Sequence, residues 1–375
     1  MNDHGRADTP LQQLTRLGQS VWIDWLSREL LASDELQRLI AEHAVVGVTT
    51  NPTILERAIT GSSAYDRQIR DLIAFGLSAH EIATELARAD VTEAALQLLP
   101  VWQASGGADG YVSWEVAPAL AWNPVATLAA VGLLHELIQL PNLLVKIPAT
   151  EPGLAAIEDS IAAGHSINAT LIFSLERYAA VAESYLRGLR RAADAGLDLS
   201  TIHSVASFFI SRLDSAADKL LDQQRSPLAA GRQGRLGIAS AKLAYRHFQA
   251  VFSGRRWEAL RARGATPQRL LWASTSSKDP AYRDVRYVEG LIGPETVTTL
   301  PKTTLEAFED HGQVAATLER DVEEAELSMG DLAALGLDLG RLTDELERDG
   351  IAQFARSFDA VVERIRALGE RPLAA

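Results

Sequence analysis

The sequence predicts a (β/α)8, or TIM, barrel with additional N- and C-terminal helices, and three observations lead to this prediction. Eight short apolar segments follow one another, and each is followed by apolar residues at helical spacing. Several segments are apolar on both faces, as in a parallel sheet that is covered on both sides. Their polar residues gather at or just past the C-terminal ends, where barrel enzymes place their active sites. A doubly wound sheet is the alternative, and it explains these polar ends less well.

Strands are expected at residues 20–26, 45–52, 110–116, 142–148, 166–173, 203–209, 269–275 and 296–301. Helices are expected over 11–19, around 30–40, within 52–109, over 123–140, 152–164 and 177–195, on both sides of the glycine-rich loop 231–237, and over 303–375. Residues 1–10 are expected to be disordered, and 303–375 to serve packing. We divide the chain into an N-terminal tail with a short helix (1–19) and a single barrel domain with a C-terminal helical extension (20–375).

Composition narrows the function classes. The 375 residues are 47% hydrophobic, enough for a large core. A formal net charge of −13 disfavours nucleic acid as a partner, and the lack of cysteine excludes disulfides and thiolate catalysis. The eight histidines form no HxH or HExxH cluster, so neither a metal nor a cofactor is expected. No run approaches the roughly 18 apolar residues that a membrane helix needs, and a cytoplasmic protein is expected.

One lysine lies in the middle of the fourth apolar segment. Lys146 shares a strand face with Leu144, while Val145 and Ile147 point the other way. A buried ammonium costs free energy unless it is paired or neutral, and a neutral amine is the nucleophile of Schiff-base chemistry. A structural ion pair, or a side chain that reaches solvent from the strand end, is the plainer interpretation. Among 36 lysines and arginines, however, only five are lysines, and arginine cannot become a neutral nucleophile.

Further polar side chains at the strand ends complete a candidate site. They are two carboxylates, two amides, two hydroxyls and a guanidinium: Asp24, Glu115, Asn51, Asn168, Thr170, Ser207 and Arg212. A buried amine beside carboxylates can form and hydrolyse an imine, because one carboxyl moves protons on the substrate while another assists water. The arginine and hydroxyls offer an anion clamp. For single residues plainer interpretations stay open, such as a helix cap for the aspartate and a turn signal for Asn-Pro.

Six motifs in this order resemble the transaldolase family in its longer bacterial form. They are GVTTNPT (47–53), SWEV (113–116), VKIPAT (145–150), INATLIF (167–173), SVASFFISR (204–212) and LWAST (271–275). The similarity spans residues 20 to 312 and, more loosely, the C-terminal helices. It implies metal-free transfer of a dihydroxyacetone unit from sedoheptulose 7-phosphate or fructose 6-phosphate to glyceraldehyde 3-phosphate or erythrose 4-phosphate. This is the chemistry of the non-oxidative pentose phosphate pathway.

The resemblance also implies roles for the candidate residues. Lys146 matches the Schiff-base lysine, and Asp24 matches the group that removes the C4 hydroxyl proton. Glu115 and Thr170 match the pair that holds the catalytic water. The remaining matches contact the substrate or its phosphate: Asn51, Asn168, Ser207 and Arg212.

Two stretches depart from the family pattern. Shorter transaldolases carry a phosphate-binding arginine after the seventh strand, whereas here Ser274 is followed by three hydroxyl residues and Lys278. Ser274 and Lys278 are therefore the expected phosphate contacts at this position. The family commonly has an acidic residue and an arginine where this chain has Ala117 and Ala119, which affects how the following loop is held.

Two other functions compete with a transaldolase. A fructose-6-phosphate aldolase-like enzyme would use water or free dihydroxyacetone in place of the acceptor sugar, but that family is much shorter. A non-catalytic sugar-phosphate-binding barrel subunit would have lost at least one of the four catalytic residues. This chain has all of them: Lys146, Asp24, Glu115 and Thr170. Lys302 is the rival for the imine, but its flank is typical of a helix start on the surface. A monomer or homodimer is expected.

Overall fold

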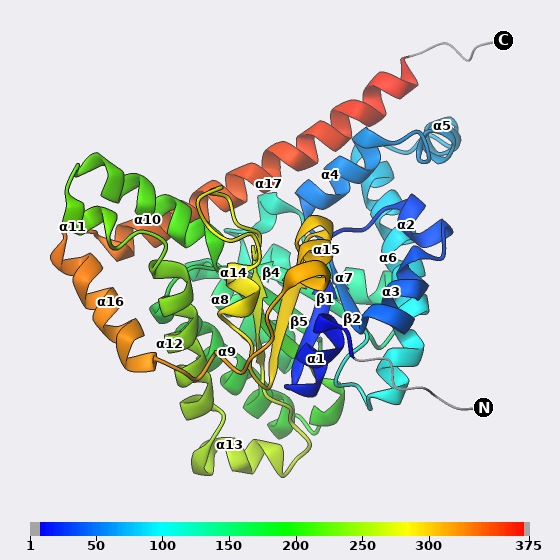
Figure 1. The fold of residues 1–375 in the computed structure, drawn as a ribbon. Coiled ribbons are helices and arrows are strands. Elements are labelled where there is room, and N and C mark those ends of the chain that lie inside the picture. Colours follow the sequence, from blue (N-terminus) through cyan, green and yellow to red (C-terminus); the bar gives the residue numbers. More distant parts are fainter. Residues whose placement is uncertain (1–7, 371–375) are drawn as a thin grey trace, which may run out of the picture.

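The computed structural model describes residues 8–370 and contains a closed barrel of eight parallel strands (Figure 1). The strands are β1 (Gln19–Ile23), β2 (Val45–Thr49), β3 (Tyr111–Glu115), β4 (Leu143–Pro148), β5 (Ile167–Ile172), β6 (Ser204–Phe209), β7 (Arg269–Ala273) and β8 (Thr296–Leu300). Their spatial order follows the chain, and β1 pairs with β8 to close the barrel. The predicted (β/α)8 barrel is confirmed, and the doubly wound sheet is excluded.

Helices precede, connect and follow the strands. They are α1 (Pro10–Arg16), α2 (Arg28–Ala32), α3 (Glu35–His43), α4 (Pro52–Gly61), α5 (Asp66–Ala74), α6 (Ala79–Ala104), α7 (Pro124–Ile138), α8 (Glu151–Ala162), α9 (Leu175–Asp194), α10 (Ser211–Gln223), α11 (Pro227–Ala230), α12 (Leu236–Val251), α13 (Gly254–Arg261), α14 (Arg286–Glu289), α15 (Lys302–His311), α16 (Val322–Ala334) and α17 (Leu339–Gly369). Two short 3-10 helices are η1 (Pro118–Leu120) and η2 (Leu199–Thr201). None of the described helices is long and apolar enough to cross a membrane.

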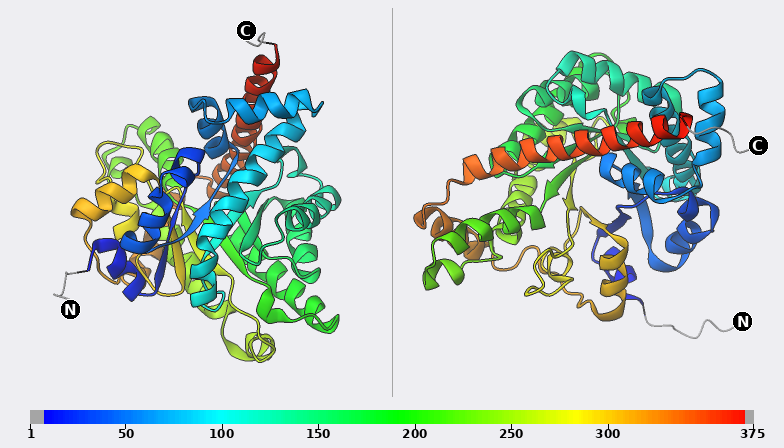
Figure 2. Two further views of the ribbon diagram at one scale, coloured as in Figure 1. Left: turned by 90° about the vertical axis from the view of Figure 1, so that its right-hand side faces the viewer. Right: turned by 90° about the horizontal axis from the view of Figure 1, so that it is seen from above.

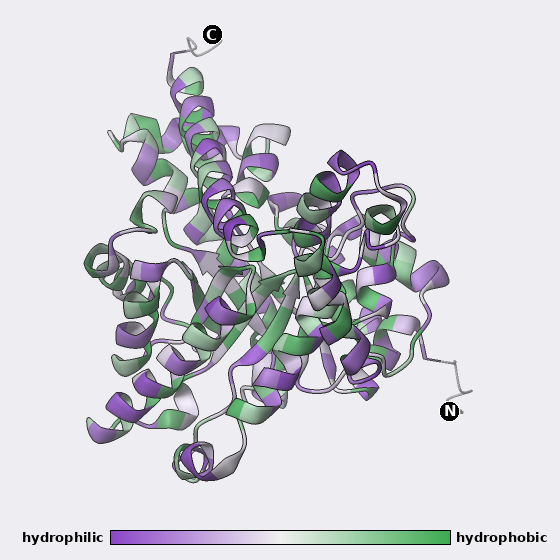
Figure 3. Ribbon diagram, turned by 90° about the vertical axis from the view of Figure 1, so that its left-hand side faces the viewer, coloured by the Kyte–Doolittle hydropathy of each residue, from purple (hydrophilic) through white to green (hydrophobic). Residues whose placement is uncertain are grey.

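The strands are buried on both faces because one face fills the barrel and the other meets the helices. Hydrophobic residues gather in the central strands, whereas hydrophilic ones are frequent on the outer helices (Figure 3). The side chain of Trp22 shows how closely the barrel is packed. A Cβ atom added at Gly47 would lie 2.4 Å from its indole ring, so only glycine fits at that point of β2.

Several predicted strands end earlier than expected: β2, predicted to reach residue 52, ends at Thr49, and β1 and β7 are also shortened. Ser274 has a φ of 59°, and this left-handed conformation ends β7 at Ala273 rather than at residue 275. The run 20–26 forms a strand only as far as Ile23, so Asp24 lies just past β1 rather than inside it. The differences at β1 and β7 move polar side chains onto the rim of the barrel.

The N-terminal segment is more ordered than predicted. The expected disorder of residues 1–7 lies outside the described residues, but Thr9 and Pro10 already form a helix start. The Thr9 hydroxyl accepts a hydrogen bond from the Gln12 amide at 3.3 Å, and the Thr9 amide donates to the Gln12 side chain at 3.1 Å. This capping box, followed by proline at the first helical position, overrides the polar composition of the segment.

The last helix, α17, crosses one end of the barrel (Figure 2). Its 31 residues correspond to about 46 Å of helix, long enough to span the barrel opening. It packs against α4, α5, α6 and η1 and also against α10 and β5. The hydroxyls of Thr53 on α4 and Ser357 on α17 form a hydrogen bond of 2.9 Å, which fastens α17 to α4.

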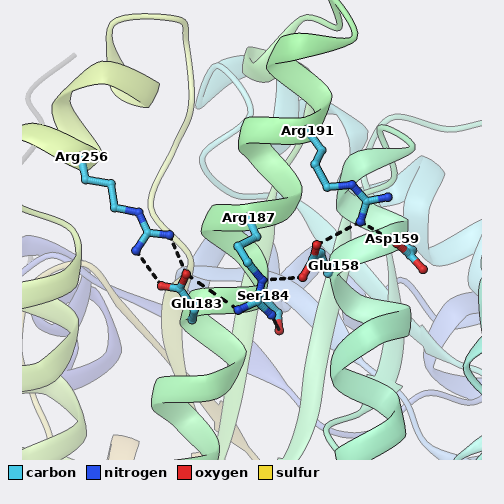
Figure 4. A network of polar contacts seen from close by, with 7 residues as sticks. All are labelled: Glu158, Asp159, Glu183, Ser184, Arg187, Arg191 and Arg256. Atoms are coloured by element: carbon cyan, nitrogen blue, oxygen red, sulfur yellow. Dashed lines mark hydrogen bonds and ion pairs between the residues drawn. The ribbon is translucent and has the colours of Figure 1, made fainter.

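Outer helices are also tied together by ion pairs (Figure 4). Arg187 of α9 reaches Glu158 of α8 at 2.6 Å, and Arg256 of α13 pairs with Glu183 of α9 through both nitrogens, at 2.6 and 2.7 Å. Such solvent-exposed pairs contribute about 1 kcal/mol or less each, so the buried strands remain the main source of stability.

Candidate active site

A cavity of about 490 Å³ opens among the C-terminal strand ends and is bordered by α4 and α17. Most of the predicted site residues line it: Asp24, Asn51, Lys146, Ser207, Arg212, Ser274 and Lys278. The other three, Glu115, Asn168 and Thr170, are buried beside it on neighbouring strands. Residues up to 254 positions apart in sequence are therefore gathered into one site.

Lys146 lies inside the barrel, with 4% of the residue exposed. In the strand pairing it stands opposite Glu115 of β3 and Asn168 of β5. Its amine donates a hydrogen bond to the carbonyl oxygen of Thr50 at 3.1 Å and lies 3.5 Å from Glu115 Oε2. The amine thus faces the cavity with a buried carboxylate at its side.

Glu115 is the carboxylate nearest to that amine. Burial raises the pKa of Glu115 to about 7, although Lys146 and then Arg212 oppose this shift. Its Oε2 accepts no hydrogen bond from a described residue, so this oxygen can bind a water or a substrate atom. A carboxyl group that titrates near neutral pH can both donate and accept a proton under working conditions.

Asp24 is the second carboxylate of the cavity, held at the rim directly after β1. Its amide donates to the carbonyl oxygen of Leu300 at 3.1 Å, which fixes the turn. Burial raises the pKa of Asp24 to about 6, and the cations Lys278, Lys146 and Arg57 act in the opposite direction. At neutral pH the group is mainly a carboxylate and can act as a base.

A chain of hydrogen bonds links three inward-facing polar residues. Ser207 donates to Asn168 Oδ1 at 2.7 Å, and Asn168 Nδ2 donates to Ser113 Oγ at 3.1 Å. These bonds orient the Asn168 amide next to Lys146. Thr170, fully buried two residues further along β5, has a hydroxyl oxygen with no hydrogen-bond partner among the described residues.

Asn51 serves the fold and the cavity together. Its Oδ1 caps α4 by accepting a hydrogen bond from the Ile54 amide at 3.0 Å, and Pro52 follows at the first helical position. Asn-Pro therefore marks the start of a helix rather than a turn, and Asn51 also lines the cavity. Its Nδ2 donors remain available to a ligand.

Three cations line the cavity without a carboxylate partner among residues 8–370: Arg57, Arg212 and Lys278. The amine of Lys278 donates only to Ser276 Oγ, at 2.6 Å. Burial lowers the pKa of Arg212, and the nearby Glu115 opposes that shift. Cations that are left without carboxylate partners around a cavity favour an anionic ligand.

Three further residues line the cavity that the sequence did not single out as site residues: Arg57 on α4, and Gln353 and Phe354 on α17. The expectation that 303–375 only serve packing is wrong for α17, because Gln353 and Phe354 line the cavity from above the strand ends. Arg57 follows the Asn-Pro motif by less than two helical turns, so that motif was a signal that could have pointed to it.

The profile of the family described as Transaldolase/Fructose-6-phosphate aldolase matches residues 21–365. This chain belongs to that family. Among its curated relatives, a "Transaldolase" of Thermobifida fusca is 45% identical over 95% of this chain and 97% of its own length. "Transaldolase 2" of Streptomyces avermitilis is also 45% identical, over 95% and 96%. The family resemblance drawn from the six motifs is confirmed.

The loop after β3 has Ala117 and Ala119 where the family commonly has an acidic residue and an arginine, so other contacts hold it. Ala117 and Ala119 are exposed on either side of Pro118 in η1. Thr150 donates a hydrogen bond to the carbonyl oxygen of Ala121 at 2.6 Å, just past η1. Threonine-to-backbone bonding thus fastens this loop to the C-terminal end of β4.

Lys302 does not belong to the site. It begins α15, is exposed, and pairs with Glu35 Oε1 at 2.8 Å. Its neighbours Pro301 and Thr303 line the cavity, but Lys302 does not. In residues 8–370, no group of three or more His, Asp or Glu side chains is arranged to hold a metal ion.

Proposed function

We propose that this protein is a transaldolase that transfers a dihydroxyacetone unit through a Schiff base on Lys146. The observation that supports this proposal most strongly is a buried amine, 3.5 Å from the Glu115 carboxylate, at the base of a cavity lined by Asp24 and unpaired cations. Donors are sedoheptulose 7-phosphate or fructose 6-phosphate. Acceptors are glyceraldehyde 3-phosphate or erythrose 4-phosphate.

The first half of the reaction forms the imine. The amine of Lys146 adds to the C2 carbonyl of the donor, and the resulting carbinolamine loses its hydroxyl as water. Glu115, whose pKa lies at about 7, supplies the proton for that leaving hydroxyl, and the free Thr170 hydroxyl holds the departing water. The same two groups return a water molecule when the imine is hydrolysed.

The second half breaks and remakes a carbon–carbon bond. Asp24 takes the proton of the C4 hydroxyl, the C3–C4 bond breaks, and its electron pair moves into the iminium to give an enamine on Lys146. The shortened aldose phosphate leaves. The enamine then attacks the aldehyde carbon of the acceptor, and Asp24 returns its proton to the new hydroxyl.

The other lining residues hold the substrate. Asn51 and Asn168 bond the hydroxyls of the dihydroxyacetone unit, and Ser207 orients Asn168. Arg212, Ser274 and Lys278 bind the phosphate group, for which Arg57 adds positive charge. We further propose that the enzyme works in the cytoplasm as a monomer or homodimer.

Borohydride trapping tests the proposal directly. Fructose 6-phosphate and borohydride are expected to add one reduced dihydroxyacetone unit to the peptide that carries Lys146, as read by intact and peptide mass spectrometry. Trapping without an acceptor suffices, because the dihydroxyacetone unit stays on Lys146, and protonation of its enamine at carbon gives the iminium that borohydride reduces. A label on Lys302 would keep the reaction but move the site, and folded protein that binds the sugar without a label would contradict the proposal.

The family also includes fructose-6-phosphate aldolases, and one assay separates the two activities. A transaldolase releases little free dihydroxyacetone from fructose 6-phosphate until an acceptor is added, whereas an aldolase releases it continuously. The match of this chain to relatives named transaldolase over 95% of its length favours the first outcome.

Gln353 is expected to contact the sugar from α17. Replacing Gln353 with alanine removes a hydrogen-bonding group worth about 0.5–1.5 kcal/mol, so KM for the acceptor should rise roughly 2- to 10-fold. Borohydride labelling at saturating donor should stay unchanged. The control is Arg356→Ala, an exposed residue of the same helix that does not line the cavity. Equal KM values in the two variants would contradict a contact.

A further inference from the structure

The segment 274–282 carries Lys278 from β7 toward α14 and is fastened at both ends to one helix, α10. That helix also carries Arg212 at its second position. Lys278 and Arg212 therefore stand on two pieces of chain whose relative position is set by a small number of contacts.

The first fastening is at Ser274. The amide of Ser211 donates to the Ser274 carbonyl oxygen at 3.0 Å, and the two hydroxyls lie 2.9 Å apart. Ser274 has a left-handed φ of 59°, a conformation that a serine keeps only when its surroundings hold it. Because Ser211 directly precedes Arg212, this end of the segment is fixed beside the arginine.

The second fastening is a tyrosine–aspartate pair at the other end. Tyr282 donates to Asp218 Oδ2 at 2.7 Å, and Asp218 Oδ1 accepts the amide of Gly234 at 2.8 Å. Gly234 has a φ of 67°, and a Cβ atom there would lie 2.6 Å from the Arg286 guanidinium. The glycine-rich loop 231–237 thus lets the chain approach closely enough to complete this pair.

A parallel pair lies one helical turn away. Tyr287 donates to Asp214 Oδ2 at 2.9 Å, and Asp214 Oδ1 accepts the amide of Gly237 at 2.7 Å. The Arg286 guanidinium stands over both tyrosine rings, 4.2 Å from the centre of the Tyr282 ring and 5.2 Å from that of Tyr287. We call Asp214, Asp218, Tyr282 and Tyr287 the clasp. None of the four lines the cavity.

Lys278 and Arg212, the two cations whose chain segments the clasp joins, line the same cavity. Burial lowers the pKa of Lys278 first, and the neighbouring cations Arg212 and Arg57 lower it further, whereas Asp24 raises it. Like charges on a loop and on a helix repel each other when no anion lies between them. A loop free to move would relax away from Arg212, and phosphate binding would then have to restore the geometry.

We propose that the clasp is a positioning device that holds Lys278 opposite Arg212 and so sets the affinity of the enzyme for the phosphate group of its substrates. The inference rests on the proposed function, in which Arg212 and Lys278 bind phosphate. It assigns a role to four residues and one glycine-rich loop that the chemistry does not use.

Tyr282→Phe tests the proposal in the full chain. This change removes one hydroxyl and keeps the ring under Arg286. We expect KM for fructose 6-phosphate and the inhibition constant of inorganic phosphate to rise about 3- to 10-fold together, with kcat within about twofold. Asp218→Asn is the second variant, since it keeps the shape of the carboxylate. The matched control is Tyr65→Phe, because Tyr65 also donates to a buried aspartate, Asp90, at 2.7 Å.

A double-mutant cycle separates positioning from general stability. If the clasp acts through Lys278, then Tyr282→Phe should change phosphate inhibition little in a Lys278→Met background. The proposal would be overturned if the effects of Tyr282→Phe and Lys278→Met on phosphate inhibition simply added. It would also be overturned if Tyr282→Phe lost thermal stability, as Tyr65→Phe does, but kept its affinity for phosphate. A Lys278→Met variant with an unchanged inhibition constant for phosphate would also overturn the proposal. Trapping of the imine on Lys146 would not be affected by that result. If trapping itself failed, calorimetric titration with inorganic phosphate would still test the clasp.

Discussion

Lys146→Ala and Lys146→Arg are each expected to lower kcat by on the order of 10⁴-fold or more, as is typical when a covalent nucleophile is lost. Alanine has no amine. Arginine places a permanent positive charge near Glu115 and cannot add to a carbonyl. The pair of variants therefore separates the nucleophile from the charge, and activity should be lost in both.

The fold is expected to survive these changes because Glu115 can adjust. Burial already raises the pKa of Glu115 to about 7. Lys146 has the largest opposing effect and lowers this pKa. In Lys146→Ala this pKa rises further, so Glu115 is protonated at neutral pH and no buried charge is left unpaired. In Lys146→Arg the guanidinium stays beside Glu115 as a charged partner.

The measurement combines steady-state turnover with thermal unfolding followed by circular dichroism. Lys302→Met is the control, since it removes an exposed lysine that pairs with Glu35 and should leave turnover unchanged. Substantial transfer by a folded Lys146 variant would contradict the assignment of the imine to this residue.

The barrel and its strands were predictable because their signal is local. Parallel strands covered on both sides must be apolar on both faces, and proline or glycine near their ends marks their limits, as Pro141 and Pro148 do around Lys146. A lysine inside such a run is visible without any tertiary information. The deviations of strand ends arose where one residue, such as Ser274, adopts a left-handed conformation that side-chain patterns do not reveal.

The parts of the site that come from helices were not predictable in the same way. Gln353 and Phe354 lie in a helix whose apolar spacing is equally typical of a helix packed on the outside of a barrel. Only the three-dimensional path of α17 across the strand ends brings them into the cavity. The same holds for the clasp, in which Asp218 and Tyr282 meet although they lie 64 positions apart in sequence.

Asp24→Asn is expected to lower the rate of transfer by about 10²- to 10⁴-fold, the range typical of a lost general base. Imine formation comes before the step that needs Asp24, so borohydride labelling of Lys146 should persist. A labelled but slow enzyme is the signature of a residue that acts on the carbon–carbon bond. Asp90→Asn is the control, because Asp90 is a buried aspartate that accepts hydrogen bonds from Arg28 and Tyr65 away from the cavity. It should lower thermal stability with kcat unchanged.

The pH dependence gives the same residue a second test. Bond cleavage needs the carboxylate form, and the pKa of Asp24 is raised to about 6, so the cleavage rate should fall about tenfold per pH unit below 6 and level off above it. The Asn variant has no group that titrates at this position, so its residual cleavage rate, measured in single turnovers from the preformed imine, should lack that acidic limb. The pKa of Glu115, about 7, belongs to the water step and should remain visible when imine formation is followed instead. An acidic limb near pH 6 that survives in single-turnover cleavage by Asp24→Asn would assign the base to another group.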